Sequence, residues 1–345
     1  MNAALDGFGQ KHLGGVNPMP TNESLPPLNV PARLIPVPSS ISPEAQSMLA
    51  LGTISSPEFP PLEDHEAWRT MRSESEEVVL SYLTSRFPEE GIDVTKMEVE
   101  GVGVFAITPP DVDPDDPRIY FDIHGGGLTM GGGDCGRAMG TLIALNVGMH
   151  LWEVDYRMPP DDPYPASLDD CLAVYRALLR DHRADEIIVG GASAGGNLAT
   201  ALILRARDEG LPLPAAAVLL SPEVDLTESG DSFQTNLGVD TVLTRSLMPA
   251  NLLYAGGHDL SDPYVSPLFG DFARGFPPAL ISSGTRDLFL SNAVRLHRAL
   301  RSAGISAELH VLEAAPHGGF MFETEEDQAL DAEIRSFIDE HCPRQ

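Results

Sequence analysis

The sequence has very few lysines and a large excess of acid. Among its 345 residues are 22 basic and 51 acidic ones, and Lys11 and Lys96 are the only lysines, which leaves a formal net charge of −29. The phosphates of a nucleic acid and the headgroups of an anionic membrane would be repelled by such a chain. This charge argues against both as partners, and otherwise it indicates only solubility.

Cysteine and long hydrophobic runs are also scarce. No stretch of eighteen apolar residues occurs, and residues 1–15 lack the basic, apolar and small-residue order of a secretory signal, so we expect a cytoplasmic protein. Cys135, Cys171 and Cys342 follow neither metal-binding nor disulfide spacing, which predicts reduced thiols and no metal. Cys135 stands near a glycine-rich stretch, where it either packs in the core or lines a pocket.

The N-terminal quarter differs in composition from the rest. Residues 1–62 are rich in proline, glycine, serine and asparagine, and the prolines are expected to break any regular element, which indicates an arm or part of a lid. Apolar residues then recur at helical spacing over 64–87, which predicts an amphipathic helix. We therefore divide the chain into an arm and cap segment, residues 1–95, and a catalytic domain, residues 96–345.

From Lys96 onward the pattern changes to apolar strands separated by helices. Such strands indicate a mostly parallel sheet with helices on both faces. Residues 225–267 interrupt the alternation and are expected to form, with the N-terminal segment, a helical cap over the sheet. The predicted strands are 118–123, 151–155, 187–190, 215–220, 279–283 and 307–312, after a strand pair within 96–107, and the predicted helices are 167–181, 196–207, 291–303 and 326–341.

A serine flanked by small residues stands between one predicted strand and the next helix. The segment Gly191-Ala192-Ser193-Ala194-Gly195 directly follows an apolar run. Its turn is tight and strained, so its flanks must be small, and the serine hydroxyl is left exposed above the sheet. The pattern predicts that Ser193 is a nucleophile for acyl transfer.

A serine nucleophile needs a base, and the base needs an acid that fixes its tautomer. His317 follows a predicted strand and lies in a loop with small neighbours, whereas His297 falls in a helix and His310 in a strand. Asp287 closes the loop after strand 279–283. Asp259 and Asp262 compete with it by chain order but lie in the insertion. We assign His317 as base and Asp287 as acid.

The same chemistry requires donors for a developing oxyanion. His124-Gly125-Gly126-Gly127 ends another strand, and its glycines let backbone amides approach a substrate closely. The amide of Ala194, directly after the nucleophile, would join them. Neither glycine triplet of the region has the strand, turn and helix spacing of a dinucleotide site, so no such cofactor is expected.

With these motifs in place the chain resembles the hormone-sensitive-lipase-like, bacterial family IV branch of the α/β-hydrolases. The likeness covers about 118–341 and includes the glycine loop, Asp155-Tyr156-Arg157, the serine turn, Ser221-Pro222 with Asp225, and the two triad partners. It implies the α/β-hydrolase fold with a helical cap and carboxylesterase activity on short acyl chains. It also implies no cofactor, frequent homodimers, and an oxyanion hole made by Gly126, Gly127 and Ala194, with His124 orienting the loop.

Two departures from this family are visible, Ala192 in place of an aspartate before the nucleophile and the extra Gly319 after the histidine motif. Neither removes a catalytic group. Residues adjacent in sequence to catalytic positions are expected to line the substrate pocket. Glu223 follows a strand end and either contacts substrate, relays a proton, or is an exposed loop acid. The candidate substrate-binding residues are Leu128, Met130, Glu223, Leu288, Phe289 and Phe320.

The sequence therefore predicts an esterase that forms an acyl-enzyme on Ser193. An amidase or peptidase with the same triad is an alternative, although no propeller-like repeat that would gate peptides is visible. A ligand receptor on a hydrolase fold is another, although receptors of that kind typically lose a triad member.

Overall fold

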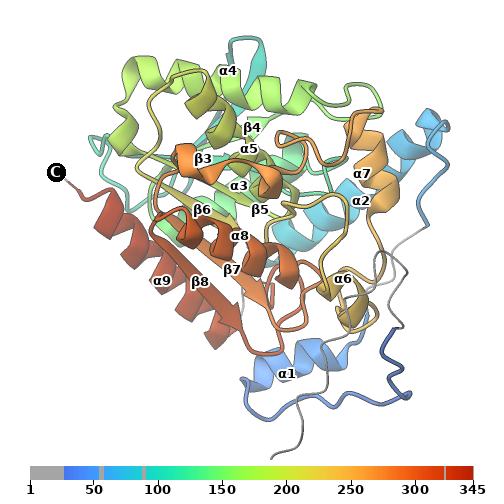
Figure 1. Ribbon diagram of the computed structural model, residues 1–345. Helices are drawn as coiled ribbons and strands as arrows, with labels where there is room; N and C mark the ends of the chain where they lie inside the picture. The colour runs from blue at the N-terminus through green and yellow to red at the C-terminus, as the bar shows by residue number, and fades with distance from the viewer. Residues whose placement is uncertain (1–26, 54–57, 88–90, 322–323, 345) are drawn as a thin grey trace, which may run out of the picture. The chain divides into compact units, whose positions relative to one another are not determined.

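The computed structural model describes residues 27–53, 58–87, 91–321 and 324–344. The chain divides into two units, 1–36 and 37–345. Residues 27–36, the described part of the first unit, form neither helix nor strand. Every helix and strand of the described chain belongs to the second unit (Figure 1). None of these helices combines the length and the apolar character that a membrane crossing requires.

The second unit is built on one sheet, which has eight strands within the described residues and the order β1-β2-β4-β3-β5-β6-β7-β8. β2 pairs antiparallel with β1 and β4, and all other neighbours are parallel, which confirms the predicted mostly parallel sheet. The strands are β1 (Asp93–Val99), β2 (Val102–Thr108), β3 (Ile119–Ile123), β4 (His150–Asp155), β5 (Ile187–Ala192), β6 (Ala216–Leu220), β7 (Ala279–Gly284) and β8 (Ala307–Leu312).

Helices cover both faces of this sheet (Figure 1). On one face, α3 (Gly133–Val147) and α9 (Glu325–His341) pack on the apolar side chains of β2, β3 and β6. The other face carries α4 (Ala166–Asp181), α5 (Ala194–Asp208) and α8 (Leu290–Ser302) over the larger core cluster. Both faces of β3 and β5 are therefore buried, as the apolar sequence of β5 and the mostly apolar sequence of β3, which also contains the buried Asp122, predicted.

A smaller layer joins the N-terminal region to the insertion. α2 (His65–Arg86), capped by the side chain of Asp64, confirms the predicted amphipathic helix. Its buried Trp68 and Met71 pack with Ala250 and Leu253 of α7 (Met248–Ala255), which lies in the insertion after α6 (Ser232–Thr235). The short 3₁₀ turns are η1 (Ala184–Glu186), η2 (Pro267–Phe269) and η3 (Phe272–Arg274).

The structure corrects two sequence-based expectations. Residues 1–62 were expected to hold no regular element, yet α1 (Pro43–Ala50) forms, because Pro43 occupies the first helical turn and Ser42 caps it. α3 was not predicted, because it begins within a glycine-rich stretch. A Cβ on its Gly140 would lie 2.9 Å from the Glu153 Oε2 atom, so this glycine lets the helix approach β4 closely.

Gly190 of β5 is a position where the core leaves no space for a side chain. A Cβ added there would lie 2.0 Å from the hydroxyl oxygen of Tyr120, which is itself fully buried and cannot move aside. We expect Gly190→Ala to lower the free energy of unfolding by about 1–3 kcal/mol or more through overpacking. Denaturant titration would measure the change.

Gly103→Ala is the matched control, because its Cβ would lie 3.3 Å from the partly exposed side chain of Asp155. A small effect there and a large one at Gly190 is the expected pattern. Equal unfolding midpoints for the two variants would contradict this account of the core.

Candidate active site

Ser193 stands at the junction of β5 and α5 with φ +56°, a backbone conformation that side-chain-bearing residues rarely adopt. The turn is packed too closely for larger neighbours. A Cβ on Gly191 would lie 2.4 Å from the backbone of Gly195, and one on Gly195 would lie 1.8 Å from the carbonyl oxygen of Ile123. These contacts give the small flanking residues a physical cause.

The structure brings Ser193, His317 and Asp287 together. His317 Nε2 lies 2.9 Å from Ser193 Oγ, and His317 Nδ1 lies 3.1 Å from Asp287 Oδ1. The three residues follow β5, β8 and β7, at the carboxyl edge of the parallel strands, where ligands of open α/β sheets bind. Ser193 is half-buried, whereas His317 and Asp287 are buried.

The surroundings of Asp287 and His317 favour a charged carboxylate and a basic imidazole. Burial alone would raise the pKa of Asp287, but the charge of His317 and hydrogen bonds from the Phe289 amide and the Ser283 hydroxyl outweigh burial and lower it. Burial would lower the pKa of His317, but Asp287, Asp240 and Glu223 raise it above the ordinary value of 6.5. An imidazole placed in this way can accept the serine proton.

The competing candidates have other partners. His310 lies between the carboxylates of Glu308 and Glu333, at 2.9 and 2.6 Å. The side chain of Asp259 accepts hydrogen bonds from Ser261 in its own turn. Neither makes a recorded hydrogen bond to Ser193.

The glycine loop after β3 lies against the nucleophile. A Cβ on Gly125 would be 3.4 Å from the Cβ of Ser193. The carbonyl of Gly126 accepts from the amides of Thr129 and Met130, which folds the loop back on itself. Within the described chain no acceptor is recorded for the amides of Gly126 and Gly127, and Ala194 is the first residue of α5, where amides lack helical partners. Such amides are available to an oxyanion.

His124, at the start of this loop, contacts its backbone and the ring of Tyr156. Its Nδ1 lies 2.8 Å from the carbonyl oxygen of Gly125, and its ring stacks on Tyr156 at 4.0 Å between ring centres. Tyr156 in turn donates its hydroxyl to the carbonyl of His124. Burial lowers the pKa of His124 to about 4, so the ring is neutral near pH 7. These contacts suit an orienting group better than a base.

Two residues of α2 hold the other end of the loop, and the sequence interpretation missed both. Arg72 donates through Nε to the carbonyl of Thr129 at 2.9 Å and through Nη2 to the carbonyl of Pro159. Glu76, one helical turn further on, accepts from the amide of Gly131 at 2.8 Å. A signal was present, because a charged pair spaced by four residues occupies one face of the predicted helix.

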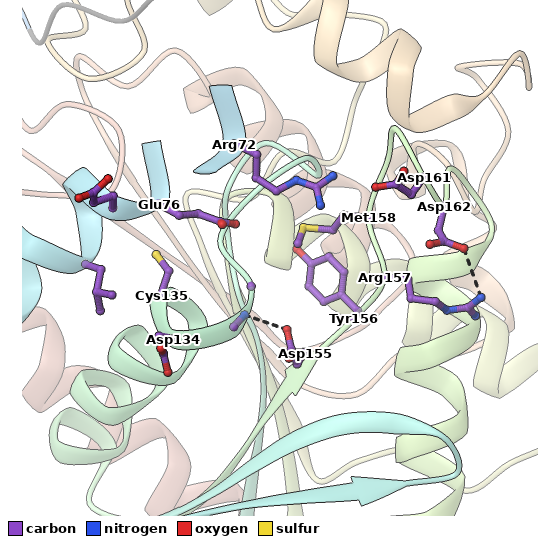
Figure 2. Close-up of a pocket in the computed structure, with 14 residues that line it drawn as sticks. Arg72, Glu76, Asp134, Cys135, Asp155, Tyr156, Arg157, Met158, Asp161 and Asp162 are labelled. Atoms are coloured by element: carbon purple, nitrogen blue, oxygen red, sulfur yellow. Dashed lines mark hydrogen bonds and ion pairs between the residues drawn. The ribbon is translucent and has the colours of Figure 1, made fainter. Parts of the chain in front are cut away.

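A cavity of about 500 Å³ lies beside the same loop, between α2 and the start of α3 (Figure 2). Its lining includes Arg72, Glu76, Cys135, Asp155 and Arg157, and no member of the triad. Cys135 is buried and also lines this pocket. Burial, with a contribution from Glu76, raises the pKa of its thiol to about 11, which keeps it protonated and unreactive near neutral pH.

The candidate substrate-binding residues are placed differently from one another. The ring of Phe289 meets that of His317 edge-on, with ring centres 4.8 Å apart. Met130 is partly buried and packs with the cluster of α2 and α7. Leu128, Leu288 and Phe320 are buried in three separate apolar clusters, and that of Phe320 includes residues of α1.

Glu223 is not an exposed loop acid, so that alternative was wrong. The residue follows β6 and is fully buried, with its amide donating to the carbonyl of Ser193 at 3.0 Å. Burial raises the pKa of its carboxyl to about 8, and the charge of Glu228 adds to this, while His317 and Asn251 act in the opposite direction. Short-range sequence could not show this burial, because it depends on contacts with residues distant in the chain, such as Ser193.

Comparisons with known proteins agree with this fold. Residues 120–321 match the model of a family described as having the α/β-hydrolase fold. An esterase of Acinetobacter venetianus is 33% identical over 226 residues, which is 64% of this chain and 74% of that protein. An acetyl-hydrolase of Streptomyces hygroscopicus is 33% identical over 241 residues, 69% of this chain and 80% of that protein.

Solved structures extend the likeness beyond the sequence matches. The crystal structure of esterase E25 superposes with a TM-score of 0.83 at 33% identity and covers 92% of this chain and 99% of its own. An esterase from the bacterial hormone-sensitive lipase family superposes with a TM-score of 0.74 at 31% identity, covering 87% of this chain and 99% of its own.

Glu223 generates a prediction about stability. Its pKa in the folded protein, about 8, lies above the ordinary value of 4.5, so between these values the folded state holds a proton that the unfolded state has lost. Its contribution to the free energy of unfolding therefore falls as the pH rises through this range. Glu223→Gln should remove that loss, so the variant should gain stability relative to wild type at pH 8 compared with pH 5.

Urea titrations of both proteins at the two pH values would measure the difference. Glu98→Gln, at an exposed position of β1, is the matched control and should show no pH-dependent gain. A parallel pH dependence for wild type and Glu223→Gln would show that the carboxyl is already ionised in the folded state.

Proposed function

The chain belongs to the α/β-hydrolase family, in its bacterial hormone-sensitive-lipase-like branch, and is a carboxylesterase; we propose that Ser193, His317 and Asp287 perform the hydrolysis through an acyl-enzyme. The observation that carries this proposal is the continuous hydrogen-bond chain Ser193 Oγ, His317 Nε2, His317 Nδ1, Asp287 Oδ1. That order matches the roles of nucleophile, base and orienting acid.

In the first half of the reaction, Ser193 Oγ attacks the ester carbonyl while His317 Nε2 takes its proton. Asp287 accepts from Nδ1–H and stabilises the imidazolium that forms. The negative charge on the carbonyl oxygen is received by the amides of Gly126, Gly127 and Ala194, where one donor is typically worth about 10²–10³-fold in rate. Collapse of this intermediate breaks the ester C–O bond, and His317 gives its proton to the departing alkoxide oxygen.

The second half repeats these steps with water. His317, neutral again, takes a proton from a water molecule whose oxygen attacks the acyl carbon. The same amides receive the oxyanion, and the C–O bond to Ser193 breaks as His317 returns the proton to Oγ. The carboxylic acid leaves and the free enzyme is restored.

We propose short-chain acyl esters of small alcohols as substrates. The name of the Streptomyces relative specifies acetyl hydrolysis, and Phe289 restricts the space at the imidazole.

Met130 and Phe289 are proposed as pocket walls, with Leu128, Leu288 and Phe320 acting from the apolar clusters behind. Glu223, buried beside the site, stays a proposed substrate-binding or proton-relaying residue, and its charge acts on His317 only at pH values above its own pKa of about 8. The cytoplasmic location and a homodimer stay predictions, and light scattering would test the latter.

Rates on nitrophenyl esters from acetate to dodecanoate would test the substrate class. We expect the largest kcat/KM at hexanoate or shorter, because the ring of Phe289, a proposed pocket wall, lies edge-on against the imidazole of His317. A maximum at dodecanoate would reject the short-chain proposal.

Loss of the nucleophile and the pH profile together test the triad. Ser193→Ala should lose nearly all turnover and all labelling by a fluorophosphonate probe, whereas Ser283→Ala, which removes only a bond to the far oxygen of Asp287, should keep the label. Because His317 must be neutral to act as base and its pKa is raised, kcat/KM should fall as the pH decreases through a value above 6.5. A labelled, active Ser193→Ala protein would exclude Ser193 as the nucleophile.

A further inference from the structure

Asp240, in the insertion after α6, has a carboxylate with an unusual set of partners. The residue is fully buried. Oδ1 accepts from the amides of Val242 at 2.9 Å, Leu243 at 3.1 Å and His317 at 3.3 Å. Oδ2 accepts from the amide of Leu288 at 2.8 Å. All four recorded donors are backbone N–H groups, and no cationic side chain is recorded as a hydrogen-bond or ion-pair partner among the described residues.

Two of these amides belong to the catalytic loops. One is the amide of Leu288, which directly follows Asp287 in the loop after β7, and the other is that of His317 itself, in the loop after β8. One carboxylate therefore joins the backbone of the acid to the backbone of the base. This link does not depend on the side-chain hydrogen bond between Asp287 and His317.

Asp240 is the last of three polar residues spaced by four that contact the acid loop. Ser232 donates its hydroxyl to the carbonyl of Leu288 at 2.7 Å, and Asn236 donates to the carbonyl of Asp287 at 2.8 Å. Both bind one catalytic loop only. Asp240 alone among the three is recorded as binding both loops, and it alone can carry charge.

We propose that Asp240 is a positioning residue of the triad, which fixes the loops of Asp287 and His317 relative to each other and places a second buried carboxylate beside the imidazole. The proposal rests on the function proposed above for Ser193, His317 and Asp287. It assigns the insertion a part in the reaction as well as in covering the site. The physical cause is the same as in the triad, because a carboxylate near the ring favours the imidazolium that forms when His317 takes the serine proton.

Three carboxyl groups face His317, and each comes from a different element. Asp287 follows β7, Asp240 lies in the insertion and Glu223 follows β6, and all three raise the pKa of His317 while burial opposes them. Burial raises the pKa of Asp240 itself, and Asp287 adds to this, whereas His317 and the amides of Leu288 and Val242 favour its charged form. The four amide donors are suited to an ionised acceptor.

The test compares Asp240→Asn, Asp240→Glu and Asp231→Asn in the full chain on 4-nitrophenyl butyrate. Asp240→Asn keeps the shape but removes the charge and one acceptor. We expect kcat to fall about 10- to 100-fold with KM changed less than about twofold, since small misplacements of catalytic groups cost up to about 10²-fold. The acid limb of kcat/KM should move to lower pH by roughly 0.5–1 unit, because His317 loses a neighbouring negative charge.

Asp231→Asn is the matched control, because it makes the same charge change at an exposed residue. Asp231 directly precedes α6, and its side chain makes no capping hydrogen bond to that helix. It should leave kcat and the pH profile unchanged. Asp240→Glu keeps the charge but lengthens the side chain, so it should lower kcat and leave the acid limb in place. Where Asp240→Asn does not fold, the kcat and the acid limb of Asp240→Glu still test the proposal.

Three results would overturn the proposal. They are an unchanged kcat in Asp240→Asn, a reduced kcat with an unmoved acid limb in that variant, and an acid limb displaced by Asp240→Glu. Fluorophosphonate labelling separates these from failure of the proposed function, because it reports on Ser193 in the wild-type protein. A labelled wild type with an unaffected Asp240→Asn variant would reject the positioning role alone.

Discussion

The 2.9 Å hydrogen bond between Ser193 Oγ and His317 Nε2 requires two loops separated by more than a hundred residues to meet at one point. A serine on a flexible loop could not hold this contact. The tight turn after β5 fixes the hydroxyl, because its glycines allow the helix start to press against β3. Because the strands are parallel, the loops after β7 and β8 lie at the same edge of the sheet as the turn after β5. The strain at Ser193 is one that the surrounding structure must hold in place.

The segments that surround the sheet support different parts of this site. α2, from the N-terminal region, binds the glycine loop at Thr129 and Gly131 through Arg72 and Glu76. The insertion binds the loops of the acid and the base through Asn236 and Asp240. α2 and α7 also pack on each other through Trp68 and Leu253. The layer formed by α2 and the insertion therefore also contacts the loops that carry the proposed site residues.

Burial and hydrogen bonding determine which carboxyl groups of the site are charged. Asp287 is kept charged by hydrogen bonds and by His317, whereas Glu223, without comparable donors, is shifted toward the neutral form. Two carboxyls at similar depth therefore differ in charge because their hydrogen-bond donors differ. Near neutral pH His317 therefore has a charged carboxylate, Asp287, as its hydrogen-bond partner, and Glu223 is a second carboxyl group near it that can still take up or lose a proton.

The sequence by itself determined the strand and helix alternation, the serine turn and the chain order of its expected partners, because these features depend on local periodicity and on steric limits within a few residues. Local signals also explain the two missed helices. The prolines near α1 were interpreted as breakers although Pro43 starts the helix, and α3 begins in a glycine-rich stretch for which no helix was predicted. Only the tertiary structure decided that Glu223 is buried, that Arg72 and Glu76 bind the glycine loop, and that Asp240 joins the loops of Asp287 and His317. Each of these depends on contacts between residues dozens of positions apart, whose partners no local pattern specifies.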